Sequence, residues 1–184
     1  MNNLKRYSHH VTLNDGVEVT LHSITKGNGD GLIDLFAALP PEDRYYFRDG
    51  LTNTDLIANC LNNSNFDVML PIVATYRDQI VGAIVLQRCR FGWRRYLGNV
   101  WVVLAKEFEQ QSLETLLVKE VITLAPDLGL EKLIAEIPVR VEAVRVINAL
   151  STCGFNRLCV LEDIVKDYHG RYKSLMLMGY DVLQ

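Results

Sequence analysis

The sequence predicts an α/β (α+β) fold in which helices cover a mixed sheet. Two observations support this prediction. Apolar or alternating runs of strand length recur between turn signals, and four other segments place apolar side chains at helical spacing. Along the chain they follow the order strand, two helices, three strands, helix, strand, helix and two strands. Strands and helices interleaved in this way are expected to form a sheet with helices packed on it.

Local signals place the individual elements. A turn at 14–16 precedes a strand that alternates apolar and polar side chains, and residues 77–79 have the length of a hairpin connection. Asp30 marks the start of the first helix and Gly154 ends the last one. We expect strands at about 17–24, 70–76, 80–87, 97–104, 132–137, 157–164 and 172–180. We expect helices at about 30–39, 52–62, 113–124 and 141–152.

Length and composition indicate one domain. The chain has 184 residues, 49% of them hydrophobic, which is enough for a core of its own. We expect residues 1–11 to form a flexible tail and residues 12–184 to form the domain. The net charge of −3 gives no general attraction for nucleic acid or an anionic membrane. The N-terminus lacks the apolar core of a signal peptide and no run approaches roughly 20 apolar residues, which predicts a cytoplasmic protein without a membrane partner.

The cysteines and histidines give no metal-site signal. The four cysteines are widely separated, no pair has Cys-x-x-Cys spacing, and no histidine stands at ligand spacing from them. We therefore expect reduced, mostly buried thiols and no metal site. His9 and His10 are adjacent in the expected tail, where solvated side chains are the ordinary outcome.

Three short sequence segments and the element order resemble those of a known family. The segments are Asp15–Leu21 (DGVEVTL), Leu39–Arg48 (LPPEDRYYFR) and Lys166–Tyr172 (KDYHGRY), and the helix before Cys153-Gly154-Phe155 adds to the resemblance. The chain resembles the GNAT superfamily of acyl-CoA-dependent N-acetyltransferases over roughly 12–181. It is most similar to the subset of protein-lysine acetyltransferases and acetyltransferase domains fused to acyl-CoA synthetases. The resemblance implies a mostly antiparallel sheet of about seven strands flanked by about four helices.

The resemblance also implies a site for acetyl-CoA. In such enzymes the fourth and fifth strands splay apart, and the pantetheine arm pairs with exposed backbone of the fourth. On this chain the matching residues are Val102, Val103 and Leu104. The pyrophosphate rests on a glycine-containing loop at the next helix N-terminus, where free N–H groups face the anion. That loop and the start of its helix align with Glu109, Gln110, Gln111, Ser112, Leu113, Glu114 and Thr115.

This loop departs from the family pattern because Ser112 and Glu114 occupy its two glycine positions. A glutamate about 6 Å from a phosphate would cost about 0.7 kcal/mol when screened by water and about 3 kcal/mol at an effective dielectric near 20. The same residues also suit a helix that needs no ligand, with Ser112 as N-cap and Glu114 favoured in the first turn. Two interpretations stay open: a capped helix that binds the cofactor weakly, and a loop that binds an acyl-CoA in altered geometry.

The catalytic residues are less clearly marked. Glu136 on the fifth predicted strand is the best placed carboxylate for a general base, and Ser151 is the other candidate. A solvent-facing strand residue and an ordinary helix-end residue are the respective alternatives. The position where relatives often carry an acid tyrosine is Leu150, and the asparagine often found seven residues earlier is Ala143. Neither of these side chains can donate a proton.

Two function hypotheses follow. The first is an N-acyltransferase that moves an acetyl group from acetyl-CoA to a small-molecule amine or a protein lysine. The second is a binding or regulatory module that keeps the fold without turnover. The segment 88–96 holds four arginines and three aromatic residues on an expected hairpin. It could contact an acidic protein or subunit, or cover a sheet edge, and we expect no nucleic-acid partner. A homodimer formed through a sheet edge or this hairpin is a further expected partner.

Overall fold

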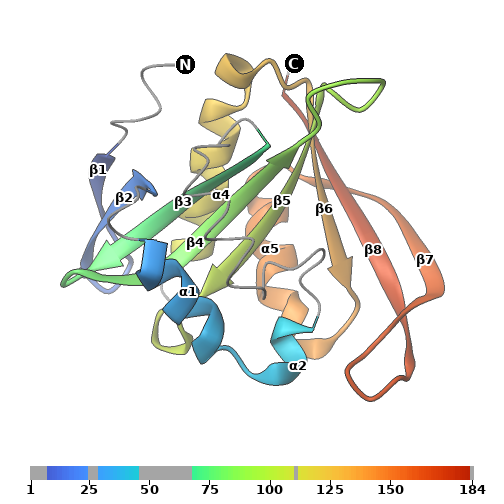
Figure 1. Cartoon of the computed structure of the whole chain (residues 1–184), viewed down its shortest axis with the longest axis horizontal. Helices are drawn as coiled ribbons and strands as arrows, with labels where there is room; N and C mark the ends of the chain where they lie inside the picture. Colours follow the sequence, from blue (N-terminus) through green and yellow to red (C-terminus); the bar gives the residue numbers. More distant parts are fainter. Residues whose placement is uncertain (1–7, 25–28, 46–67, 110–111, 183–184) are drawn as a thin grey trace.

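One sheet organises the molecule. A computed structural model describes residues 8–24, 29–45, 68–109 and 112–182. This part of the chain forms an eight-stranded sheet with helices on both faces (Figure 1). The strand order is β1-β2-β3-β4-β5-β6-β8-β7, and all neighbouring pairs are antiparallel except β5 and β6. The predicted fold class, a mixed and mostly antiparallel sheet flanked by helices, is confirmed.

The predicted elements inside the described residues form close to their expected bounds. The strands are β1 Ser8–Thr12, β2 Glu18–Ser23, β3 Met69–Tyr76, β4 Gln79–Arg88, β5 Leu97–Leu104, β6 Lys132–Pro138, β7 Asn156–Lys166 and β8 Tyr172–Asp181. The α-helices are α1 Gly29–Ala38, α2 Pro41–Arg44, α4 Leu113–Leu124 and α5 Val144–Thr152. The helix expected at 52–62 lies outside the described residues. The short helix α2 was not predicted, and it begins at the second of two adjacent prolines, a residue favoured in a first helical turn.

The eighth strand comes from residues that we expected in the tail. Ser8–Thr12 pairs antiparallel with β2, and Val11 packs against the core. His9 Nε2 lies 3.2 Å from the carboxylate of Glu120, whose pKa is raised by burial. The tail prediction is therefore wrong for residues 8–11, because alternate side chains of this segment face the molecule. The N-terminal segment adds an outer strand to the sheet.

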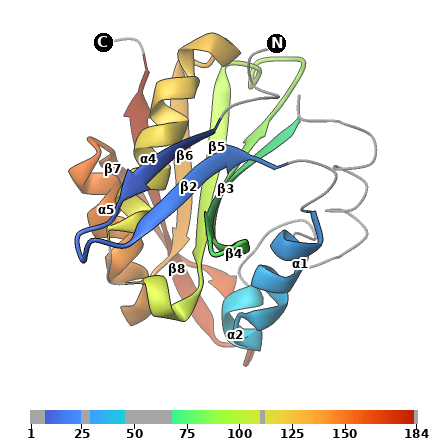
Figure 2. The same ribbon diagram turned by 90° about the vertical axis from the view of Figure 1, so that its left-hand side faces the viewer.

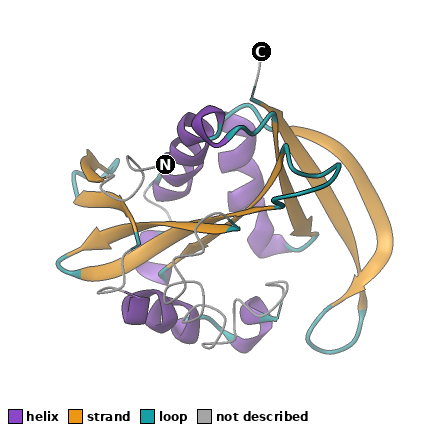
Figure 3. Cartoon of the chain, turned by 45° about the horizontal axis from the view of Figure 1, so that its top comes forward, coloured by secondary structure: helices purple, strands orange, loops and turns teal. Residues whose placement is uncertain are grey.

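The helices form two layers. Helices α4 and α5 cover one face of the sheet, and α1 and α2 cover the other (Figures 2 and 3). A large core cluster, with Leu113 and Leu117 fully buried, joins α4 to the sheet. A smaller cluster packs Leu32 and Phe36 of α1 against the opposite face. The apolar spacing that predicted α1 and α4 therefore marks the faces by which they contact the sheet.

The parallel pair β5 and β6 is joined for only three residue pairs. The pairing runs from Leu97↔Lys132 to Asn99↔Ile134, and the register records no later pair. Gly98 lies in this short junction, and a Cβ built there would come within 2.7 Å of Leu86 and 2.9 Å of Leu133. Because Gly98 has no side chain, core leucines pack closely at the point where the two strands begin to diverge. The predicted splay is present between β5 and β6, the fourth and fifth of the seven strands expected from the sequence.

The thiols do not match the expectation. Cys89 and Cys159 are exposed and Cys153 is half-buried, while Cys60 lies outside the described residues. The prediction of mostly buried thiols is therefore wrong for Cys89 and Cys159, because one follows the end of β4 and the other lies on the exposed strand β7. In the described part of the chain, no helix has both the length and the apolar character needed to cross a bilayer.

Candidate active site

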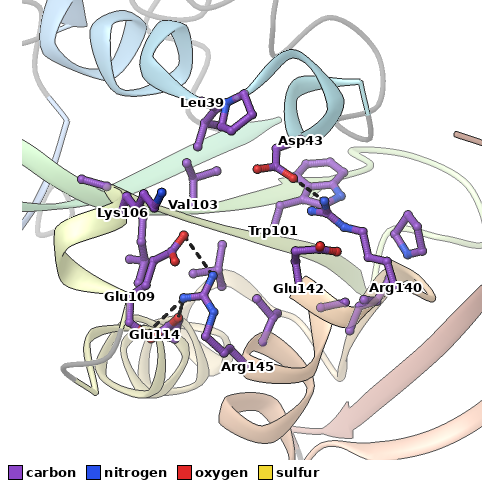
Figure 4. A pocket seen from close by; sticks show the side chains of 18 of the residues that line it. Leu39, Asp43, Trp101, Val103, Lys106, Glu109, Glu114, Arg140, Glu142 and Arg145 are labelled. Atoms are coloured by element: carbon purple, nitrogen blue, oxygen red, sulfur yellow. Dashed lines mark hydrogen bonds and ion pairs between the residues drawn. The ribbon is translucent and has the colours of Figure 1, made fainter. Parts of the chain in front are cut away.

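The divergence of β5 and β6 opens a cavity of about 550 Å³. One wall is β5 from Val100 onward, and the opposite wall is the segment Ala135–Pro138 of β6. The end of α1 borders the cavity on one side of the sheet, and the start of α4 and the face of α5 border it on the other (Figure 4). A volume of this size fits an extended small-molecule arm lying between two strands.

The strand residues that the family resemblance proposed for the pantetheine arm line this cavity. Val102, Val103 and Leu104 all line it, and each pairs with β4 on the far side. Toward β6, the strand-strand pairing has already ended at Asn99. The main chain of β5 therefore borders the cavity where a ligand backbone would hydrogen-bond to it. That a ligand uses these groups stays a prediction.

A side chain from α5 occupies the N-terminal end of α4. Arg145 Nη1 lies 3.0 Å from Glu114 Oε1, and Arg145 Nη2 lies 3.0 Å from Glu109 Oε1 (Figure 4). Nη1 also donates to the backbone carbonyl of Glu109 at 3.1 Å. We call these three residues the Glu-Arg-Glu bridge. One guanidinium thus joins two carboxylates at the position that the family resemblance assigned to a pyrophosphate.

The electrostatics of Glu114 follow from its burial. Its side chain is 8% exposed, and desolvation raises the pKa of the carboxyl. A hydrogen bond to its own backbone and the charge of Arg145 oppose this rise, while Glu109 adds to it. Glu114 therefore needs Arg145 to remain charged at low cost. A carboxylate in this state is a poor neighbour for a second anion.

The loop does not cap α4 as the sequence suggested. Ser112 precedes the helix at φ 65°, the left-handed region, and its side chain makes no capping hydrogen bond. Ser112 is the N-cap residue as expected, but the expected capping by its side chain is wrong, because a capping side chain requires an extended backbone at that position. The backbone instead has the conformation that a glycine would adopt freely. The loop keeps a glycine-like turn although the glycine is absent.

The other loop residues have structural or undescribed positions. Leu113 is fully buried in the core. The carbonyl of Thr115 accepts a weak hydrogen bond from the Cys153 thiol, with Sγ 3.6 Å away. Gln110 and Gln111 lie outside the described residues. Among the five described residues of the seven proposed for the phosphate loop, only Glu109 and Glu114 line the cavity.

A second ion pair lies on the other side of the cavity. Asp43 of α2 pairs with Arg140, which precedes the short 3₁₀ turn leading into α5 (Figure 4). The β7–β8 turn meets the end of α2, where the rings of Tyr45 and Tyr168 pack edge to face at 6.0 Å. These contacts connect α2 to the far half of the sheet. They enclose the end of the cavity away from the Glu-Arg-Glu bridge.

The two catalytic candidates are not brought together. Glu136 lines the cavity from β6. Ser151 is exposed on α5 and lies outside the cavity lining. Its neighbour Leu150 is buried and lines the cavity, so the next residue around the helix faces away. The position of Ser151 therefore gives no support to a catalytic role, and both catalytic assignments stay predictions. Ala143 also lines the cavity, so the positions matched to the family's tyrosine and asparagine border it without donor groups.

The charged residues that line the cavity are mostly acidic. Among the described residues, six carboxylates and three cations border it, which gives this part of the lining a formal charge of −3. The carboxylates are Asp43, Glu107, Glu109, Glu114, Glu136 and Glu142, and the cations are Lys106, Arg140 and Arg145. The field of such a lining favours a cationic ligand group over an anionic one.

Arg145 is the residue of this site that sequence reasoning missed. Glu109 and Glu114 were evident, but their partner lies some thirty positions later, on a different helix. A signal was available, since carboxylates gathered at a buried helix end call for a nearby cation. Nothing in the sequence indicated which arginine supplies it.

The arginine-rich segment 88–96 lies apart from the cavity. Phe91 is 84% exposed and Trp93 is 78% exposed, and the Arg94 guanidinium lies 5.8 Å from the Trp93 ring centre. Arg88 instead turns toward the chain and donates to the carbonyl of Leu128 at 3.2 Å. The prediction that these residues merely cover a sheet edge does not account for two aromatic rings left in solvent.

Solved structures share this fold at low sequence identity. No family model and no curated protein sequence matches the chain. The GNAT domain of PAT from S. lividans superposes with a TM-score of 0.75 at 14% identity, over 95% of this chain and 96% of that one. Ribosomal-protein-alanine N-acetyltransferase from Brucella melitensis gives 0.73 at 20% identity, over 88% and 98%.

A putative acetyltransferase from Salmonella typhimurium, solved with its cofactor acetyl-CoA, gives a TM-score of 0.73 at 16% identity, over 89% of this chain and 94% of that one. These likenesses cover nearly the whole chain on both sides of each comparison. They show that the chain has the fold of the GNAT acetyltransferases, with eight strands in the described residues.

Proposed function

We propose that this protein is an N-acyltransferase that uses an acyl thioester of the acetyl-CoA type. The observation that supports the proposal is the cavity between β5 and β6, which begins where their pairing stops. An unpaired strand edge facing a cavity is suited to hold an extended amide-containing arm by main-chain hydrogen bonds. The GNAT fold of the chain supports this reaction class, and the position of the cavity supports it as the place of the reaction.

The residues present fit the pantetheine arm of the donor and do not fit its diphosphate. Val102, Val103 and Leu104 would hold the arm along β5. A bound acyl thioester supplies an activated carbonyl, and its transfer forms an amide bond as the carbon–sulfur bond breaks. Glu136 is the carboxylate of β6 that would accept a proton from the acceptor ammonium. Holding donor and amine side by side would supply most of the rate.

The acceptor that suits this cavity is a primary amine on a protein. The lining has a formal charge of −3, which attracts an ammonium group. One of the similar structures supports a protein acceptor through its name, ribosomal-protein-alanine N-acetyltransferase. A lysine side chain reaching in past α2 would place its amine near Glu136.

A transfer assay tests the proposal. Wild-type protein is incubated with acetyl-CoA or acetyl-pantetheine and a set of lysine peptides and diamines, and acetylated products are identified by mass spectrometry. Glu136→Gln should lower the rate by about 10²-fold or more if this carboxylate acts as the base. Glu131→Gln is the matched control, because Glu131 is exposed just before β6 and does not line the cavity. Absence of product with every acceptor and both donors would contradict the proposal.

A non-catalytic binding module is the second candidate, and one observation favours it. Leu150 and Ala143 border the cavity at positions matched to the family's tyrosine and asparagine, so neither can protonate a leaving thiolate. A module of this kind would bind the thioester in the same cavity and release it unchanged. Binding of acetyl-pantetheine without any product would select it over the enzyme.

A further inference from the structure

The N-terminus of α4 is occupied by the chain's own guanidinium. We propose that the protein selects its acyl donor by the pantetheine arm alone, and that the Glu-Arg-Glu bridge excludes the diphosphate of CoA from the α4 N-terminus. The donor class is then a pantetheine thioester to which a nucleoside diphosphate adds no affinity. This inference rests on the proposed function, since it concerns the donor half of the same cavity.

The Glu-Arg-Glu bridge fills the position where an anion would bind at the start of α4. Arg145 uses Nη1 for Glu114 at 3.0 Å and for the Glu109 carbonyl at 3.1 Å, and Nη2 for the Glu109 carboxylate at 3.0 Å. A phosphate loop would present N–H groups at this place. Here Glu109 turns a carbonyl oxygen toward the site, and a carbonyl repels an anion where an N–H would bind it.

The charges of the two bridge carboxylates also disfavour a diphosphate at this position. A diphosphate at this position would meet two carboxylates, one of them 8% exposed and poorly screened by water. Each such contact weakens anion binding by roughly 3-fold when screened and by 100-fold or more when it is not. The single cation between the carboxylates is already shared by both. The bridge as a whole carries a net charge of −1, so the bridge itself offers no attraction for an anion.

Opening the bridge has a cost of its own. If Arg145 left to bind a phosphate, the buried Glu114 would lose its cation, and a buried charge without a partner is strongly unfavourable. Burial already raises the pKa of Glu114 against the effect of Arg145. The arginine is therefore held in the bridge and does not act as a free phosphate ligand.

The other part of the donor site does not depend on the bridge. The wall of β5 from Val100 to Leu104 borders the cavity with main-chain groups, and its position is set by the pairing with β4. Neither carboxylate of the bridge belongs to this wall. A pantetheine arm can thus lie along β5 while the site next to it stays closed.

The first experiment compares two donors that differ only in their phosphates and nucleotide. Calorimetric titration of wild-type protein with acetyl-pantetheine and with acetyl-CoA should give dissociation constants within about 3-fold of each other, or favour acetyl-pantetheine. Acetyl-CoA binding at least 10-fold tighter would overturn the inference and leave the proposed function intact. Absence of binding by both ligands at millimolar concentration would overturn the inference together with the donor site itself.

The second experiment opens the bridge. The double variant Glu109→Gln with Glu114→Gln removes both carboxylates and leaves Arg145 free, so acetyl-CoA should bind about 10-fold tighter while acetyl-pantetheine is unchanged. Adding Arg145→Gln should remove this gain. Should the double variant fail to fold, Glu109→Gln alone serves, because Glu109 is half-exposed and should give part of the gain.

A matched control separates the bridge from the removal of a surface carboxylate in general. Glu131 is exposed, does not line the cavity and takes no part in the bridge, so Glu131→Gln should change the acetyl-CoA dissociation constant by less than about 3-fold. An equal gain in Glu131→Gln and in the double variant would overturn the inference. So would a gain that acetyl-pantetheine shares.

Discussion

The two ends of the proposed donor site differ in how much of the GNAT pattern they keep. The gap between β5 and β6 is present with the form expected of a GNAT fold. The N-terminus of α4, at the other end of the same cavity, is filled by Arg145. The gap is lined by main-chain groups, which are present whatever side chains the residues carry. The second depends on glycines and uncharged surroundings, so a few substitutions change it completely.

The largest expected effect is obtained by filling the gap. Val146 lies on α5 and lines the cavity, so Val146→Trp should place an indole in the space of the thioester arm. We expect acetyl-pantetheine binding to weaken by about 100-fold or more, as measured by calorimetry.

Val144→Trp is the control for this variant. Val144 is on the same helix but 52% exposed, and it does not line the cavity. Its replacement should leave binding within about 2-fold of wild type. Equal binding by both variants would show that the ligand site is elsewhere, and thermal unfolding of both would establish that they are folded.

The next prediction concerns the start of the gap. Gly98→Ala would introduce a Cβ 2.7 Å from Leu86 and 2.9 Å from Leu130 and Leu133. We expect the free energy of unfolding to fall by about 1–3 kcal/mol, measured by urea denaturation, because the core around it must shift. Gly92→Ala is the comparison, since no atom lies within 4 Å of the added Cβ there, although its φ of +79° adds a backbone cost. A neutral Gly98→Ala would mean that the strands can separate freely at this point.

Breaking the Glu-Arg-Glu bridge should make the free energy of unfolding depend on pH. Arg145→Ala leaves the buried Glu114 without its cation, so the pKa of that carboxyl rises further above its unfolded value. The pKa of a glutamate in the unfolded chain is about 4.3. When the folded-state pKa is higher, the folded state binds the proton more tightly, so the free energy of unfolding falls as pH rises from the unfolded pKa to the folded one. At pH 7 we expect the variant to be about 1–3 kcal/mol less stable than wild type, and less so at pH 5.

A second substitution checks the source of this pH dependence. Adding Glu114→Gln to Arg145→Ala removes the titrating carboxyl, so the difference between pH 5 and pH 7 should disappear. Denaturant unfolding of wild type, single and double variants at both pH values gives the answer. A pH dependence that persists in the double variant would assign it to another group.

The smallest effect is expected at the turn before α4. Ser112 has φ 65°, where a side chain costs roughly 1–2 kcal/mol, but glycine also loses more entropy on folding. Ser112→Gly should therefore raise the free energy of unfolding by up to about 1 kcal/mol. Acetyl-CoA affinity should change little in this variant, because the bridge remains. A large gain in affinity would show that the turn, not the bridge, closes the site.

The sequence predicted the frame of the molecule well because the frame depends on periodicity. Apolar spacing located α1, α4 and the inner strands, and the family resemblance located the gap at Val102 to Leu104. The missed strand β1 has only five residues, two of them histidines, and its apolar signal is a single valine. Segments this short are stabilised by their neighbours and not by their own pattern.

The site was harder to predict because it depends on contacts between distant residues. Glu109 and Glu114 were expected to disfavour a phosphate, which stays a prediction, and the cation that joins them comes from α5. Ser112 was assigned a capping role that needs an extended backbone, and its φ cannot be read from residue type. Ser151 was a catalytic candidate because it follows the tyrosine position, and this one-residue shift along α5 leaves it exposed outside the cavity lining. Helix rotation and side-chain pairing are tertiary properties.

The short junction between β5 and β6 also has a mechanical meaning. In the described residues, the halves of the sheet on either side of the gap are connected through three residue pairs, 97–99 with 132–134. Five residues of β5 extend beyond them, a lever arm of roughly 17 Å at about 3.3 Å per residue. A rotation of a few degrees at the junction therefore becomes a displacement of about 1 Å at the open end. The three backbone pairs, together with the Asp43–Arg140 and Glu109–Arg145 ion pairs at the cavity, thus limit how wide a ligand the protein can admit.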